Sequence, residues 1–232
     1  MIIGIDYSMN SIGICIYENT EYKFYSFMNT FGLSSAIDFN FDKNCNETTK
    51  LILKNIDEYT LFSRKPNSIN KKIKKELKNC ELNRWHRQTL VDSNNVANII
   101  FKFLCELNVF DKKPNFVIEN YITSRNGGDT TIQIIEFTKT FKDLLLSKTN
   151  MDNITIVTAP EIKMLAGNGN FTKQNMLESF IKETNLTHKF YDLCVKNILT
   201  FKKGSKDVIK PIDDLVDAYF LVKWFLLYKT KI

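Results

Sequence analysis

The chain has 232 residues, 44% hydrophobic and 12% aromatic, a composition that predicts a packed globule and argues against a disordered chain. Its formal net charge of +6 is modest, so it favours a polyanionic partner only where the basic residues are clustered. The five cysteines are scattered without a Cys-x-x-Cys pair, which gives no support to a zinc knuckle or a disulfide framework and favours a reducing, intracellular (cytoplasmic) compartment.

Residues 1 to about 28 are predicted to form three short strands. The run "MIIGID" is apolar and rich in isoleucine, as in a central strand, and "SIGICIY" and "EYKFYSF" flank the turn-like "ENTE". A hairpin meander joined to the first strand is the natural arrangement. Asp6 lies within the first run and no basic segment precedes it, so we do not interpret this end as a signal peptide.

The range of about 33–84 is predicted to be an insertion within a single domain spanning residues 1–232. Asparagine, lysine and aspartate dominate it, and the stretch 64–87 is strongly basic. A solvated charged helix and a DNA-binding surface both fit this composition. The basic residues that we consider for DNA binding are Lys71, Lys72, Lys74, Lys75, Arg84 and Arg87.

Helical and strand patterns alternate over the rest of the chain. Helices are predicted at 91–110 and 129–147, strands at 115–121 and 153–159, and further helices from about residue 172 onward. The order predicts an α/β fold in which helices cover one sheet. The last helix, from about residue 212, is very apolar but too short for the ~20 residues of a membrane span. We therefore predict that it is buried or lies at a dimer interface.

Four carboxylates stand out against this background. Asp6 and Glu119 each interrupt an apolar strand, and an unpaired buried carboxylate is costly. Asp214 and Asp217 lie three residues apart on one face of the last helix, although Asp213 would share a face with Asp217 too. Helix capping or pairing with a lysine explains any one of these acids, but is a weaker explanation for all of them together.

A carboxylate cluster without histidine or cysteine selects Mg²⁺ or Mn²⁺ over zinc. Two such ions, ~3.5–4 Å apart, can activate a water on one side of a phosphodiester and stabilise the leaving oxygen on the other. His86 and His188 have no serine or cysteine motif beside them, and we interpret both as surface residues.

The segment "TAPEIKMLAGNGNFTKQNM", residues 158–176, links a predicted strand to a predicted helix and combines a proline, two glycines and two lysines. Backbone at Gly167 and Gly169 could approach a phosphate closely, while Lys163 and Lys173 supply positive charge. An ordinary turn with two solvated lysines is the alternative.

Several of these motifs resemble the RuvC family of Holliday junction resolvases, within the ribonuclease H-like superfamily. "GIDYSMNSIGI" is similar to the family's first strand and turn, "VIEN" to the strand with the second acid, and "DDLVDAYFL" to its closing D-x-x-D-A helix. That last match favours Asp214 over Asp213. The 158–176 segment is similar to the loop after the family's last core strand. These motifs span the chain, with little similarity between them.

The resemblance implies a ribonuclease H-like mixed sheet, a three-strand antiparallel meander plus parallel strands, flanked by helices. It implies two Mg²⁺ ions, replaceable by Mn²⁺, bridged by Asp6 and completed by Glu119, Asp214 and Asp217. It also implies that Lys173 stabilises the transition state and that Lys163, Gly167 and Gly169 hold the DNA strand.

The implied activity is cleavage of four-way DNA junctions by paired symmetric nicks, made by a homodimer and without any membrane association. Tyr121 is the nearest candidate for an aromatic wedge, and Arg125 follows in a stretch expected to lie over the junction. Two alternatives stay open. One is a ribonuclease H-like nuclease for other branched DNA, flaps or RNA–DNA hybrids, and the other is a non-catalytic junction-binding module.

Overall fold

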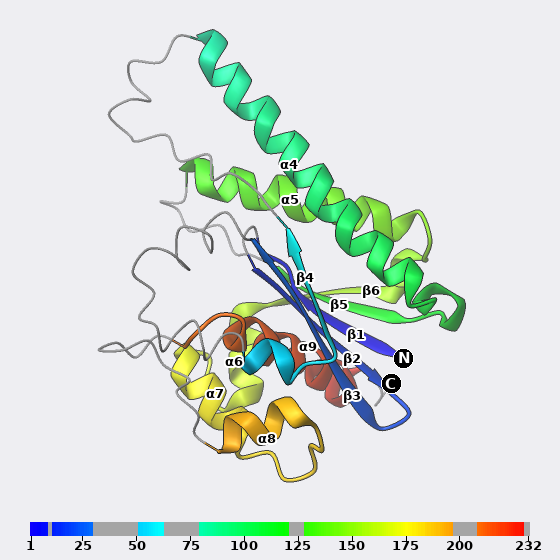
Figure 1. Ribbon diagram of the computed structural model, residues 1–232, viewed down its shortest axis with the longest axis vertical. Coiled ribbons are helices and arrows are strands. Elements are labelled where there is room, and N and C mark those ends of the chain that lie inside the picture. Colours follow the sequence, from blue (N-terminus) through cyan, green and yellow to red (C-terminus); the bar gives the residue numbers. More distant parts are fainter. Residues whose placement is uncertain (9–10, 30–50, 63–78, 121–127, 197–207, 230–232) are drawn as a thin grey trace.

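The computed structural model describes residues 1–8, 11–29, 51–62, 79–120, 128–196 and 208–229. Its centre is a six-stranded sheet with the strand order β4-β3-β2-β1-β5-β6 (Figure 1). The strands are β1 (Ile2–Asp6), β2 (Ser11–Glu18), β3 (Glu21–Asn29), β4 (Glu58–Phe62), β5 (Asn115–Asn120) and β6 (Ile154–Thr158).

The first three strands form an antiparallel meander, and β5 and β6 extend the sheet in parallel from β1. This mixed sheet, flanked by helices, confirms the predicted ribonuclease H-like α/β fold class. The strand β4, parallel to β3, was not predicted and lies within the range interpreted as an insertion. Its sequence, EYTLF, has mostly exposed side chains, so it lacks the apolar run that marks the central strands.

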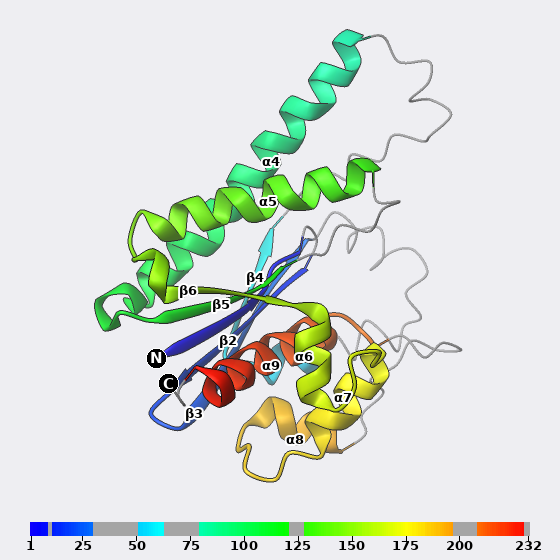
Figure 2. The same ribbon diagram turned by 180° about the vertical axis from the view of Figure 1, so that it is seen from behind.

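Helices cover both faces of the sheet (Figures 1 and 2). On one face lie α4 (Asn79–Glu106) and α5 (Gly128–Leu146), and on the other α6 (Ala159–Ala166), α7 (Lys173–Ile181), α8 (Lys189–Val195) and α9 (Ile212–Tyr228). Short 3₁₀ turns, η1 (Val109–Lys112) and η2 (Met151–Asn153), precede β5 and β6. Since α4 begins at Asn79, the end of the predicted insertion also belongs to a helix, whose later part packs on the sheet through residues such as Phe103 against Phe27.

The alternation of side chains along the strands divides the core in two. Ile3 and Ile5 of β1 join the apolar cluster beneath α4 and α5, while Gly4 and Asp6 point to the face covered by α9. On β5, Ile118 likewise faces α4 and α5. One face of β1 and β5 is therefore apolar, and the other combines the apolar Ile2 and Val117 with glycine and acid.

Helix α9 is buried, one of the two alternatives predicted for it, and its residues from Ile212 to Val222 are all buried. Two glycines let it approach the sheet. A Cβ added to Gly13 would lie 2.3 Å from the carbonyl oxygen of Asp214, and one added to Gly4 would lie 2.2 Å from that of Ala218. Backbone of α9 thus rests on β1 and β2. In the described part of the chain, no helix has both the length and the apolarity needed to cross a bilayer.

Candidate metal centre

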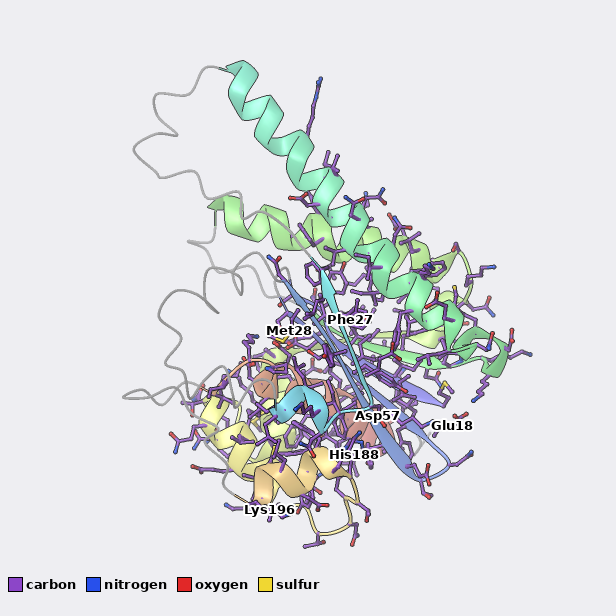
Figure 3. The ribbon with its side chains drawn as sticks, in the orientation of Figure 1. Glu18, Phe27, Met28, Asp57, His188 and Lys196 are labelled. Atoms are coloured by element: carbon purple, nitrogen blue, oxygen red, sulfur yellow. The ribbon has the colours of Figure 1, made fainter. Side chains whose placement is uncertain are left out.

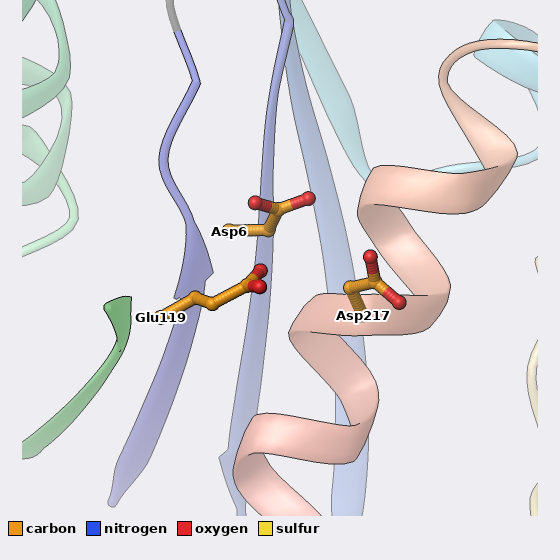
Figure 4. Close-up of side chains that lie close together, drawn as sticks. All are labelled: Asp6, Glu119 and Asp217. Atoms are coloured by element: carbon orange, nitrogen blue, oxygen red, sulfur yellow. The ribbon is translucent and has the colours of Figure 1, made fainter. Parts of the chain in front are cut away.

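Three carboxylates from three elements meet at the carboxyl ends of β1 and β5. Asp6 ends β1, Glu119 lies near the end of β5 and Asp217 lies on α9, and oxygens of the three side chains come within 4.8 Å of one another (Figure 4). The parallel register of β1 and β5 explains why Asp6 and Glu119 are neighbours. Ile5 pairs with Ile118, so the next residue along each strand lies beside the other. All three are buried, with exposures of 4%, 8% and 7% respectively.

Burial and mutual repulsion disfavour the charged forms of this cluster. Burial raises the pKa of Asp6 well above its ordinary value, and the charges of Glu119 and Asp217 raise it further. The same two effects, burial first and then the charge of Asp217, raise the pKa of Glu119 to about 7. Burial also raises the pKa of Asp217. A cation bound between them would remove this repulsion.

The cluster fits a small, hard divalent ion. Oxygen ligands about 2.0–2.1 Å from Mg²⁺ lie at most about 4.2 Å apart across the ion, so carboxylate oxygens already within 4.8 Å need only a small movement. The three side chains line an open cavity of about 340 Å³ together with Asp213, Asp214 and three lysines. Five carboxylates against three ammonium groups leave two formal negative charges, which one divalent cation balances.

Asp214, the predicted fourth ligand, lines the same cavity but is not among the three clustered acids. One of its oxygens accepts a hydrogen bond from the Ser11 hydroxyl, and the other pairs with the Lys210 ammonium. The Asp214 side chain is fully buried, which raises its pKa well above the ordinary value. Asp213, which spacing left open, also faces Lys210, with Oδ2 at 3.1 Å from Nζ.

Lys210 is a residue of the site that the sequence interpretation missed. It precedes Asp213 and Asp214 by three and four residues, just before α9, and pairs with both. The attraction of these two acids and of Asp6 outweighs the effect of burial and raises the pKa of Lys210. The available sequence signal was a lysine at that spacing before paired acids, in "KPIDD".

Lys173, the predicted catalytic lysine, reaches the cluster from the first residue of α7. Its ammonium donates to Asp217 Oδ2 and lies 4.0 Å from Asp213 Oδ2. Although burial opposes it, the attraction of Asp217 raises the pKa of Lys173. Thr172 caps this helix, its side chain accepting from the backbone N–H of Asn175, and so fixes where the lysine emerges.

Lys163 lies on α6 and lines the same cavity. Helix α6 begins directly after β6 with a capping box, in which the Glu161 carboxylate accepts from the backbone N–H of Thr158 at 2.7 Å. The predicted strand-to-helix connection at 158–176 is thus the short helix α6 and a turn before α7. Both predicted lysines of this segment therefore face one cavity.

The two glycines of this segment have local structural roles. Gly167 ends α6 with φ 146°, and a Cβ added there would lie 2.7 Å from the Phe171 ring. A Cβ at Gly169 would lie 3.2 Å from the Met164 sulfur. Neither glycine lines the cavity around the carboxylates, so their contact with DNA phosphate stays a prediction.

The remaining predicted DNA-binding residues lie away from the cavity or beyond the described residues. Arg84 and Arg87 lie in α4, and the Arg87 side chain is exposed. The predictions for Lys71, Lys72, Lys74, Lys75, Tyr121 and Arg125 fall outside the described residues.

The interpretation of His188 as a surface residue was wrong. Its side chain is only 9% exposed, and its Nε2 lies 2.9 Å from Asp57 Oδ2 (Figure 3). Its Nδ1 accepts from the backbone N–H of Phe190 and caps α8. Asp57 also accepts from the backbone N–H of Phe24, so this pair ties α8 to the sheet. The polar neighbours of His188 in sequence concealed this contact with a residue 131 positions away.

The chain was compared with known proteins by sequence and by structure. No family model and no curated protein matches the sequence. A solved structure of RuvC from Thermus thermophilus is similar over 99% of this chain and 95% of its own, with 12% sequence identity and a TM-score of 0.48. A likeness at this level leaves the function to be argued from the site itself.

Proposed function

We propose that this chain is a divalent-metal-dependent endonuclease that hydrolyses phosphodiester bonds. The observation that carries the proposal is the convergence of Asp6, Glu119 and Asp217, buried and within 4.8 Å of one another, at one cavity with Lys163 and Lys173. Clustered carboxylates suit a hard cation, and lysine charges suit the phosphate group next to it. The pairing of the two in one open cavity is what an enzyme acting on a polyanion requires.

The roles of the residues follow from their positions. When bound, the ion lowers the pKa of an attacking water and stabilises the charge on the departing oxygen. Asp6, Glu119 and Asp217 hold the ion, which we take to be Mg²⁺ with Mn²⁺ as a substitute. The ammonium groups of Lys173 and Lys163 neutralise the phosphate oxygens that gain charge as the P–O ester bond breaks.

For the substrate, we propose four-way DNA junctions cut by paired symmetric nicks. The support is the motif resemblance to RuvC-type resolvases, above all "GIDYSMNSIGI", "VIEN" and the D-x-x-D-A helix. Two cuts related by a two-fold axis need two active sites, so the active form is a homodimer. The basic residues of 64–87 would hold the DNA arms.

Cleavage of matched substrates tests both levels of the proposal. The purified protein would be incubated in Mg²⁺ or EDTA with a four-way junction, a flap, an RNA–DNA hybrid and a linear duplex of shared sequence. We expect metal-dependent nicking that is fastest on the junction. Faster cleavage of the flap or hybrid would support the alternative nuclease, and junction binding without any metal-stimulated nicking would support the non-catalytic alternative.

The variant Asp6→Asn tests the site directly. It should bind the junction with unchanged affinity and fail to cut it, because it removes a metal ligand and no DNA contact. Asp152→Asn is the matched control, since Asp152 is exposed in η2 before β6, at the opposite end of the sheet strands. Cleavage by Asp6→Asn at the wild-type rate would refute the assignment. Light scattering of the active protein would show whether it is a dimer.

A further inference from the structure

The acids around the cavity form two groups, each in closest contact with a different lysine, although Lys173 of the first group also lies 4.0 Å from Asp213 Oδ2 in the second. The first group is Asp6, Glu119 and Asp217, and the Lys173 ammonium is bonded to Asp217. Three carboxylates against one ammonium leave two formal negative charges, the charge of one divalent ion. This group is the candidate metal centre described above.

The second group consists of Asp213 and Asp214 with Lys210. The Lys210 ammonium contacts an oxygen of each, Asp213 Oδ2 at 3.1 Å and Asp214 Oδ1. The other Asp214 oxygen accepts from Ser11, so both oxygens of this fully buried carboxylate are already engaged. The second group thus has a cation of its own, supplied by the chain.

Resting on the proposed function, we propose that Lys210 takes the place of a second metal ion. Its ammonium contacts both Asp213 and Asp214 and reduces their two formal negative charges to one. The free protein then binds one divalent ion, at Asp6, Glu119 and Asp217. This replaces the two-ion expectation from the sequence, in which Asp214 was a metal ligand. The role of Lys210 is to position Asp214 and to set the number of ions.

The buried Asp213 Oδ1 gives the inference a second consequence. Among the described residues it meets no hydrogen-bond donor. When the Lys210 charge is removed, Asp213 and Asp214 present oxygens to the cavity, and the cation left beside Asp213 is Lys173, 4.0 Å from Oδ2 and already bonded to Asp217. A second divalent ion is the species that would fill that position.

Binding of Mn²⁺ alone to the full-length protein tests the inference. Calorimetry should give one Mn²⁺ per chain for the wild type, two for Lys210→Met and one for Lys210→Arg, which keeps the charge. Electron paramagnetic resonance should show isolated Mn²⁺ in the wild type and a spin-coupled pair in Lys210→Met. Lys182→Met is the matched control, since this exposed lysine follows α7 outside the cavity.

A further variant guards against misfolding of Lys210→Met, which leaves the Asp214 charge unpaired. The double variant Lys210→Met with Asp214→Asn removes charge and partner together and should return to one Mn²⁺ per chain. Two ions in the wild type, or one ion in both the wild type and a folded Lys210→Met, would overturn the inference while the nuclease proposal stands. No Mn²⁺ binding to the wild type would overturn both.

Discussion

The two faces of the central strands show how one sheet serves both stability and chemistry. Toward α4 and α5, β1 and β5 present Ile3, Ile5 and Ile118, all fully buried in an apolar cluster. Toward α9, the same strands present Ile2, Val117 and glycine together with the acids Asp6 and Glu119. The first face gains free energy from buried apolar area. The second face also buries apolar side chains, but it adds like charges that repel one another, so part of its stability should depend on a bound cation.

The largest difference in cleavage rate is expected between variants of two adjacent residues of β5, Glu119 and Ile118. Removing the hydrogen-bonding partner of a metal ligand typically lowers activity by roughly 10–100-fold. Glu119→Gln should lower the cleavage rate by more than that, because it removes a metal ligand itself. In EDTA at pH 8 its melting temperature should rise, since a repelled charge is gone. Cleavage assays and thermal melts of the same preparations measure both effects.

Ile118→Ala is the control from the opposite face. It should lower the free energy of unfolding by about 2–5 kcal/mol through the cavity it leaves. Its cleavage rate well below the melting temperature should stay close to that of the wild type. A similar stability loss in Glu119→Gln would show that the two faces do not differ as we infer.

The next largest change in stability is expected where α9 contacts the sheet. Gly13→Ala places a Cβ 2.3 Å from the backbone oxygen of Asp214, which cannot move without shifting the helix. We expect a loss of at least about 1–3 kcal/mol in the free energy of unfolding, with reduced Mn²⁺ affinity because Asp217 moves with α9. Chemical denaturation and calorimetry measure these. Unchanged stability would contradict the close approach.

The stability of the metal-free protein should fall as the pH rises. The pKa of Glu119 is about 7 in the folded protein against an ordinary 4.5, so the folded state binds more protons between these values. Its stabilising contribution is present below pH 4.5 and is lost as the pH passes 7. Asp6 and Asp217, whose pKa values are also raised, act in the same direction.

We therefore expect the melting temperature in EDTA to drop by several degrees between pH 5 and pH 8. A change of one pKa unit corresponds to roughly 1.4 kcal/mol of stability, and each kcal/mol shifts the melting temperature by a few degrees. Saturating Mn²⁺ should abolish the decline. Glu119→Gln in EDTA should show a shallower slope, and a profile unchanged by this substitution would contradict the charge repulsion that we describe.

The smallest effect is expected for Lys163→Met. Lys163 lines the cavity, where Lys173 is the lysine bonded to Asp217. The loss of Lys163 should therefore weaken junction binding several-fold and leave Mn²⁺ affinity unchanged. The slope of log affinity against log salt should fall by about 1 if it contacts one phosphate. An unchanged salt slope would remove it from the DNA interface.

Local sequence patterns were sufficient to predict the central strands and to single out the acids Asp6 and Glu119. Apolar runs marked β1 and β5, and a carboxylate within such a run is conspicuous because its burial requires compensation. These features depend on neighbours in sequence. The edge strand β4 escaped prediction because its side chains are mostly exposed and its pairing with β3 depends on residues some 30 positions away.

The sequence by itself determined the mixed fold class, the apolar character of α9 and the acids Asp6, Glu119 and Asp217 as candidates. Only the tertiary structure decided that Lys210 and Ser11 hold Asp214, that Lys173 meets Asp217, and that His188 pairs with Asp57. Periodicity shows which way a side chain points from its own element. Which partner it meets is decided by the packing of elements that are distant in the chain.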